Sequence, residues 1–227
     1  MPSIIDLHVH STIGSADSEI QPEALVKQAR EVGLTGVAIT EHVAPWSDED
    51  TRRYCRECGL FLCNAREWET DAGHIITIGL SRELSGITSA SKLRDIASAQ
   101  GAFTILCHPF RDFPGPNNYL FGQMGNADSL AVKQLAEHPI FQMVDAIEIL
   151  NGGNNERENR LAQEVAKLLA KRSVAGSDAH RTPELGRCAA VFEDDVTSEQ
   201  DLLAALRSGR LHAAQRQVDG SFVAVSL

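Results

Sequence analysis

The sequence contains no apolar run that approaches the roughly 20 residues a membrane-spanning helix needs, so we expect no membrane partner. Its first three residues do not begin a signal peptide, because an apolar strand pattern follows at once, and we expect a cytoplasmic protein. The five cysteines are an odd number, which argues against a disulfide framework. Cys55 and Cys58 have no second pair at zinc-finger spacing. We therefore interpret them as free thiols in a loop and a small helix, near Cys63.

Positive charge is scarce as well. The chain has 31 acidic and 21 basic residues, which gives a net charge of −10. Broad binding to nucleic-acid backbone requires a basic face, so we do not expect extended nucleic acid as a partner. A small phosphorylated substrate remains compatible, because local cations can dominate a pocket whatever the global charge. The sequence also lacks a Gly-x-Ser-x-Gly elbow, a P-loop and a dinucleotide-binding fingerprint, which excludes the enzyme classes built on them.

No interior linker, repeat or change in composition divides the 227 residues, so we expect one domain over residues 1–227. Short apolar strands alternate with helices, which predicts βα units and a parallel sheet. Strands are predicted at 4–9, 36–40, 60–62, 74–80, 102–107, 144–149 and 173–176. Helices are predicted at 22–32, 90–100, 128–138, 158–171 and 197–208, with long loops at 44–58 and 110–124. The second loop is our candidate for a lid or a base-stacking loop.

His8 and His10 stand two apart on the first predicted strand, so their side chains share one face. By itself this pair is as compatible with one core and one surface histidine as with two metal ligands. However, six of the eight histidines lie at or beside predicted strand ends: His8, His10, His42, His74, His108 and His180. Acidic residues stand near them at Asp17, Glu41, Glu67, Glu69 and Asp178, whereas His138 and His212 look like ordinary helix or surface residues.

The loops that follow barrel strands form the active-site edge of α/β barrels. Imidazole nitrogens and carboxylate oxygens are the usual ligands of zinc, manganese and iron in hydrolytic sites. So many potential ligands exceed the need of one four-coordinate ion. We therefore predict a cluster of two or three divalent metal ions.

Five motifs occur in a fixed order: Asp-Leu-His-Val-His-Ser, Ile-Thr-Glu-His, Arg-Glu-Trp-Glu-Thr-Asp-Ala-Gly-His, Cys-His-Pro-Phe-Arg and Gly-Ser-Asp-Ala-His. Over about residues 4–212 the chain thereby resembles the PHP (polymerase and histidinol phosphatase) family. The resemblance implies an α/β fold, a distorted TIM-barrel-like (β/α)7 barrel with a trinuclear metal centre at the carboxyl ends of the strands. It also implies a metal-dependent phosphoesterase that acts on a small phosphomonoester or a nucleotide.

The same resemblance assigns ligands to the three ions. One ion would take His8, His10, Glu67 and Asp178; a second would share Glu67 and add His74 and His108. The third would use Asp17, His42 and His180. Glu41 departs from the pattern, because relatives commonly have aspartate before this histidine.

Such ions would supply the nucleophile, because a water that bridges two metals loses a proton near neutral pH. The candidate catalytic residues are Glu67, Asp178, His180 and His42, of which either histidine could assist the leaving group. Arginine suits phosphate oxygens through its planar fork. The candidate substrate-binding residues are Arg111 and Arg181, followed by Arg187.

Two other functions are compatible with part of the pattern. An amidohydrolase-like C–N hydrolase shares the barrel and the opening His-x-His, but it usually carries a lysine at a strand end in mid-chain. Lys92, Lys133, Lys167 and Lys171 all fall on predicted helices. A non-catalytic metal-binding accessory module would be expected to lose ligands, whereas this chain keeps a full set. The sequence predicts no oligomeric state.

Overall fold

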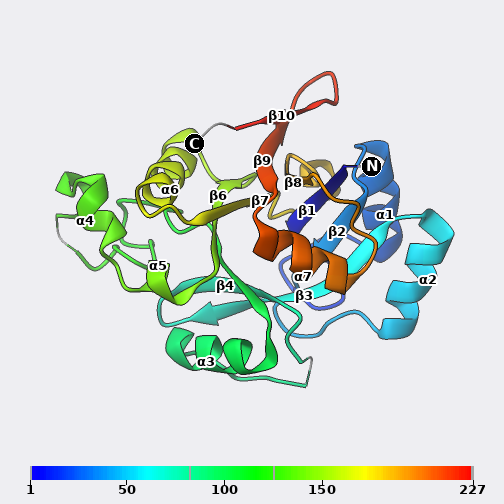
Figure 1. The fold of residues 1–227 in the computed structure, drawn as a ribbon, viewed down its shortest axis with the longest axis horizontal. Helices are drawn as coiled ribbons and strands as arrows, with labels where there is room; N and C mark the ends of the chain where they lie inside the picture. Colours follow the sequence, from blue (N-terminus) through cyan, green and yellow to red (C-terminus); the bar gives the residue numbers. More distant parts are fainter. Residues whose placement is uncertain (1, 82, 125, 226–227) are drawn as a thin grey trace.

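The computed structural model describes residues 2–81, 83–124 and 126–225. Within these residues, one ten-stranded mixed sheet curls through the molecule in the order β10-β9-β8-β1-β2-β3-β4-β5-β6-β7 (Figure 1). The strands are β1 (Ser3–Val9), β2 (Gly36–Ile39), β3 (Phe61–Thr70), β4 (Gly73–Ile78), β5 (Phe103–Leu106), β6 (Ala146–Asn151), β7 (Arg172–Gly176), β8 (Cys188–Phe192), β9 (Leu211–Arg216) and β10 (Phe222–Ala224).

The expected succession of seven βα units is not confirmed. Parallel pairs join β1 to β2 to β3 and β5 to β6 to β7, but β4 runs antiparallel to both β3 and β5. Only Asp71 and Ala72 separate β3 from β4, which allows a hairpin but no helical crossover. Strands β8, β9 and β10, which the sequence pattern did not reveal, extend the sheet from β1 as antiparallel neighbours.

The segment that follows β7 returns to β1 and forms a seam there. A parallel bridge pairs Val9 with Ala179. The Asp178 N–H donates to the His8 carbonyl at 2.7 Å, and the His10 N–H donates to the Ala179 carbonyl at 3.0 Å. The carboxyl ends of the first and last parallel strands therefore lie side by side.

Seven α-helices are found in the described residues: α1 (Pro22–Glu31), α2 (Asp48–Cys58), α3 (Ala90–Gln100), α4 (Val132–Ala136), α5 (Ile140–Met143), α6 (Glu156–Leu168) and α7 (Glu199–Ser208). Two short 3₁₀ helices are η1 (Ala127–Ser129) and η2 (Thr182–Glu184). Among the described residues, no helix combines the length and the apolar character needed to cross a bilayer.

The predicted loop over 44–58 is wrong in its second half, where α2 forms. Ser47 caps the helix by accepting the Asp50 N–H at 3.0 Å, and Gly59 ends it in a left-handed conformation. Only Thr51 and Tyr54 of this helix are buried, so it has few apolar residues from which a helix could be predicted. All five cysteines are free, with Cys55 and Cys58 on α2. The single helix predicted at 128–138 is likewise replaced by η1 and α4.

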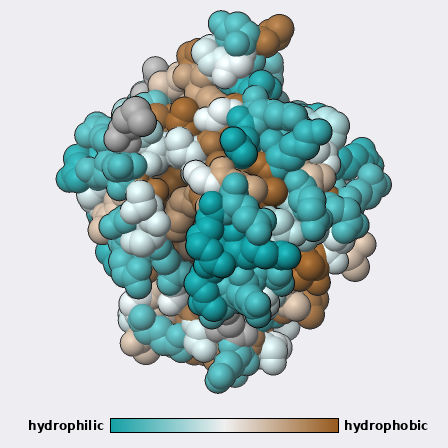
Figure 2. All heavy atoms as spheres, turned by 90° about the vertical axis from the view of Figure 1, so that its right-hand side faces the viewer, coloured by the Kyte–Doolittle hydropathy of each residue, from teal (hydrophilic) through white to brown (hydrophobic). Residues whose placement is uncertain are grey.

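The core explains why the sheet curls. One cluster of buried side chains takes members from every strand from β1 to β8, among them Leu7, Ile76, Ile105 and Phe192, and is covered by α7. Helix α1 buries Leu25, Val26 and Ala29 against a second cluster on the outside of the sheet. The face that carries α1 and α2 is consequently mostly hydrophilic toward solvent (Figure 2).

Candidate metal centre

Four side-chain atoms from three regions of the chain meet at the carboxyl end of β1. The Nε2 atom of His8 lies 3.4 Å from Glu67 Oε2 and 3.3 Å from Asp178 Oδ1. The Nε2 atom of His10 lies 3.3 Å and 3.4 Å from the same two oxygens. Four ligands held at zinc–ligand distances around a tetrahedral ion are about 3.3–3.4 Å apart. These four atoms therefore have the spacing of one coordination shell.

Both imidazoles are oriented for this role. The Nδ1 atom of His8 lies 3.0 Å from Glu148 Oε1, and that of His10 lies 3.1 Å from Ser15 Oγ. The opposite nitrogens, His8 Nε2 and His10 Nε2, are buried without a hydrogen-bond partner. Buried polar atoms are rarely left unpaired, so an unpaired lone pair on each of two converging histidines fits a bound cation.

Glu67 also faces a second group of ligands. Its Oε1 atom lies 2.9 Å from His74 Nδ1 and 3.2 Å from His108 Nε2. Its Oε2 atom belongs to the first group, so the two oxygens of this buried carboxylate point at separate sets of histidines. This arrangement fits a carboxylate that bridges two ions.

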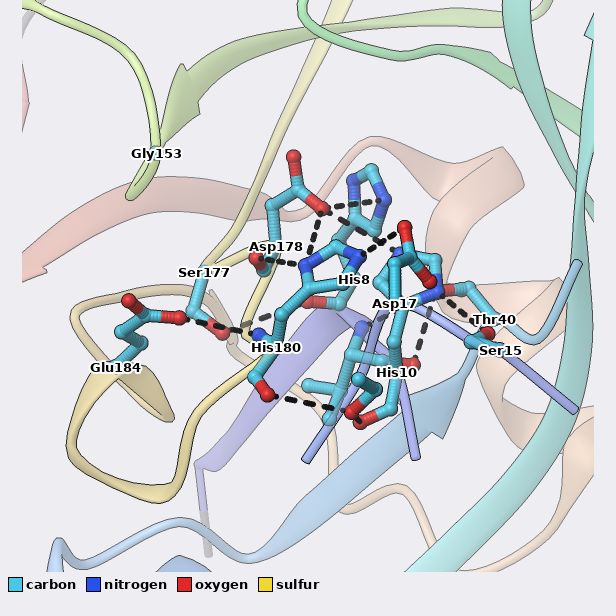
Figure 3. Close-up of polar contacts among 12 residues, drawn as sticks. His8, His10, Ser15, Asp17, Thr40, Gly153, Ser177, Asp178, His180 and Glu184 are labelled. Atoms are coloured by element: carbon cyan, nitrogen blue, oxygen red, sulfur yellow. Dashed lines mark hydrogen bonds and ion pairs between the residues drawn. The ribbon is translucent and has the colours of Figure 1, made fainter. Parts of the chain in front are cut away.

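A third group lies closer to solvent. The Oδ2 atom of Asp17 is 3.5 Å from His42 Nε2 and 3.2 Å from His180 Nε2. The rings of His42 and His180 both stack on His10, at centroid distances of 4.5 and 4.3 Å. In Figure 3, His8, His10, Asp17, Asp178 and His180 point toward a common centre. The nine ligands predicted from the sequence are thus brought together.

The carboxylates make the deep part of the cluster attractive to cations. Burial alone would lower the pKa of His10, but the nearby carboxylates of Asp178 and Glu67 outweigh burial and raise the pKa to about 9. Burial would raise the pKa of Glu67 and Asp178, yet the nearby charge of His8 holds the pKa of both well below the usual range. Positive charge is required here, and metal ions can supply it in place of protons.

Irregular backbone accompanies the ligands. His108 and Asp178 have φ angles of 29° and 54°, in the left-handed region that favours glycine. The register of β1 shifts between Asp6 and Val9, and that of β6 shifts at Glu148. Bulges and strained residues redirect side chains and concentrate at functional sites. Two of these irregularities lie at predicted metal ligands, and the other two lie beside them.

The three candidate arginines are placed differently. Arg111 lies at the cluster and donates from Nη2 to Asp178 Oδ2 at 2.5 Å and to Asn151 Oδ1 at 2.9 Å. Arg181 is two-thirds exposed and lies 3.9 Å from Glu19. Arg187 is exposed, and the structure gives its side chain no ion pair within the described residues. Only Arg111 is brought to the predicted ligands.

The sequence reasoning missed the partners that orient the ligands. Glu148 is 2% exposed and accepts from His8, from the His108 N–H and from Asn151 Nδ2. The sequence pattern also gives no sign of Ser15, and it assigns no function to Glu41. A lone glutamate inside the apolar strand predicted at 144–149 was a usable signal for Glu148, because a buried charge needs partners. Nothing comparable marks Ser15.

A curled mixed sheet covered by helices, with histidines and carboxylates gathered at its strand ends, places this chain among the metal-binding α/β proteins. Within that class, the sequence profile of the PHP domain matches residues 6–100, and that of the PHP-associated region matches residues 156–211. The chain belongs to the PHP family. Its His-x-His motif lies inside the first match, and the two matches together cover more than half of the sequence.

Comparisons with known proteins agree on the fold. The chain is 29% identical over 114 residues to an uncharacterized protein of Methanocaldococcus jannaschii, which covers 46% of this chain and 67% of that one. A Bifidobacterium adolescentis structure described as a metal-dependent phosphoesterase aligns with a TM-score of 0.63 and 14% identity, over 89% of this chain and 95% of that one.

Two further solved structures carry different descriptions. Endonuclease Q bound to a 27-mer duplex with an abasic lesion aligns with a TM-score of 0.56 and 16% identity, over 92% of this chain but only 57% of that one. An amidohydrolase from Chromobacterium violaceum with bound sulfate aligns with a TM-score of 0.61 and 12% identity, over 96% and 99% of the two chains. At these identities the likeness concerns the fold.

Proposed function

We propose that this protein is a metal-dependent phosphoesterase that hydrolyses a small phosphomonoester or a nucleotide. The observation that carries the proposal is the position of Glu67, whose two oxygens face two separate groups of histidines. Phosphoester hydrolysis commonly uses metal ions held a few ångströms apart, and a bridging carboxylate is a natural way to fix such a pair.

The residues present fit two or three divalent ions such as zinc, manganese or iron. His8, His10, Glu67 and Asp178 would hold the deepest ion, and Glu67 with His74 and His108 a second. Asp17, His42 and His180 would hold the outermost. When bound, such ions acidify water into a nucleophile and offset negative charge on phosphate oxygens.

The protein's own side chains supply the remaining functions. Arg111 is the nearest cation to the cluster, so we assign it to binding a phosphate oxygen as well as holding Asp178. Arg181 and Arg187 could contact only substrate groups that extend outward. His42 or His180, both partly exposed beside Asp17, would deliver a proton to a leaving oxygen when it is not bound to the outermost ion.

The C–N hydrolase alternative has less support. Lys92, Lys133 and Lys167 lie on α3, α4 and α6, and Lys171 directly precedes β7. All are therefore away from the carboxyl ends of the strands, where an amidohydrolase would use one. The similarity to Endonuclease Q admits a nucleic-acid substrate. However, the chain spans little more than half of that protein, and its net charge is −10.

The proposal is tested by screening the manganese- and zinc-loaded protein against phosphomonoesters and nucleotides. A His8→Ala, His10→Ala double variant should lose at least about 10³-fold in kcat/KM, together with tightly bound metal. His212→Ala on β9 serves as the matched control, since that histidine is exposed and far from the cluster in sequence and register. Activity that survives the double substitution with unchanged metal content contradicts the proposal.

A further inference from the structure

Two buried serines and one buried glutamate lie behind His10. Ser11, Ser15 and Glu41 are each at most 1% exposed, although all three are polar. Ser15 Oγ lies 3.1 Å from His10 Nδ1 and donates to Glu41 Oε2 at 2.6 Å. Ser11 Oγ donates to the other oxygen of Glu41, and among the hydrogen bonds of the described residues it has none with the His10 ring. One carboxylate thus holds two serine hydroxyls, of which only one reaches a predicted metal ligand.

We propose that Ser15 and Glu41 are positioning residues that fix the proton of His10 on Nδ1 and so present its Nε2 lone pair to a metal ion. This inference rests on the metal centre proposed above. It assigns a role to the glutamate that stands where relatives commonly have aspartate. Neither residue would touch the metal or the substrate.

The argument follows from counting protons. A hydroxyl has one proton and can donate one hydrogen bond. Two oxygens 2.6 Å apart need a proton between them, and a carboxylate can only accept, so the Ser15 proton goes to Glu41. Ser15 Oγ must then accept from His10, which places a proton on Nδ1. The nitrogen on the far side of the ring, Nε2, is the one that lies against Glu67 and Asp178 without a partner of its own.

The surroundings of Glu41 hold this direction in place. Besides the two hydroxyls, the carboxylate accepts from the Ser11 N–H at 3.2 Å and from Trp46 Nε1 at 3.0 Å. All four neighbours are donors, so the carboxylate oxygens are fully engaged. Ser15 Oγ additionally accepts the His42 N–H at 3.2 Å. This hydrogen bond also favours the orientation in which the Ser15 proton points toward Glu41. A glutamine at position 41 would point its amide N–H groups at neighbours that are themselves donors.

His8 offers an internal comparison. Its Nδ1 atom is held directly by Glu148 at 3.0 Å, with no serine between them. Histidines that bind metals commonly donate the other ring N–H to a carboxylate, and changes to such partners typically cost about 10–100-fold in metal affinity. On this reading, both histidines of the first strand are oriented by carboxylates, one directly and one through a hydroxyl.

The test compares Ser15→Ala and Glu41→Gln with Ser11→Ala as the matched control. The two serines are equally buried and share the same carboxylate, so both alanine variants remove one hydroxyl from Glu41. Circular dichroism establishes that each variant is folded. We expect the tightest zinc affinity, measured against a competing chelator, to fall about 10–100-fold for Ser15→Ala and Glu41→Gln. For Ser11→Ala we expect a change within about threefold.

Two spectroscopic readouts separate positioning from general loss of stability. In the zinc-loaded protein, the His10 Nδ1–H proton should give a hydrogen-bonded NMR signal that persists in Ser11→Ala and is shifted or lost in Ser15→Ala. The visible bands of the cobalt-substituted protein should change in the same variants. Equal zinc affinities and identical spectra for the two serine variants would overturn the proposal. If His10→Ala itself leaves zinc affinity unchanged, the metal centre is wrong rather than the role of Ser15.

Discussion

At the deep end of the cluster, the side chains of His8, His10, Glu67 and Asp178 are at most 3% exposed. Glu148 holds His8, Ser15 holds His10, and Arg111 holds Asp178. At the outer end, the side chains of Asp17, His42 and His180 are 60%, 31% and 26% exposed. Asp17 lies in a loop, and its carboxylate pairs with these two histidines. The difference suggests unequal tasks: rigid binding of ions at the deep end, and exchange of an ion and contact with substrate at the outer end.

Glu67 joins the two deep groups, so its replacement should have the largest effect. Glu67→Gln removes the charge that both groups share, and we expect kcat/KM to fall at least about 10³-fold with loss of more than one bound ion. Metal content is counted by elemental analysis alongside the kinetics. Glu69→Gln is the control: this exposed residue lies two positions further on β3 and accepts from the Tyr119 hydroxyl at 2.9 Å. Similar losses in both variants would contradict a bridging role.

Glu148→Gln tests whether the deep end depends on its supporting residues. The substitution keeps the shape but places the amide nitrogen, which also donates, against either the His8 ring or the His108 N–H, both of which donate to this side chain. We expect zinc affinity to fall about 10–100-fold. Asp145→Asn is the control. Asp145 directly precedes β6, and its carboxylate accepts from Thr104 at the amino end of that strand. Wild-type zinc affinity in Glu148→Gln would contradict the idea that supporting residues hold the ligands of the deep end.

Asp17→Asn should have the smallest effect on metal content and leave the deep end intact. We expect the number of tightly bound ions to fall by one and kcat to fall about tenfold, while the remaining ions keep their affinity. Titration with a chelator should remove the same ion first from the unsubstituted protein. Simultaneous release of all ions in that titration would show that the two ends act as one unit.

Much of this arrangement could be read from the sequence, and the reasons differ between elements. His8 and His10 share a face because strand side chains alternate, and the structure brings both to the cluster. The β3–β4 hairpin was not anticipated, because an apolar strand looks alike whether its neighbour is parallel or antiparallel. Strand β8 was missed because its buried run contains two alanines and few branched residues.

The partners of the ligands were harder to foresee than the ligands. Ser15 and Glu41 are far apart in sequence and meet only because the loop after β1 folds over the end of β2. Arg111 was expected to bind phosphate, and its ion pair with Asp178 depends on the loop after β5 lying against the residues that follow β7. Such contacts depend on tertiary geometry, which local patterns do not encode.

The seam between β1 and the segment after β7 has a further consequence. His8 and His10 stand on one side of it and Asp178 on the other, while Val9 and Ala179 form the bridge itself. Separating the two segments would pull apart the predicted ligands of the deepest ion, so metal binding and the pairing of the two segments would be thermodynamically linked. The deepest ion would hold the two sides of the seam together, because its predicted ligands come from both. Amide hydrogen exchange at His10 and Asp178 should therefore slow as metal is added, which would report the strength of the cluster without any substrate.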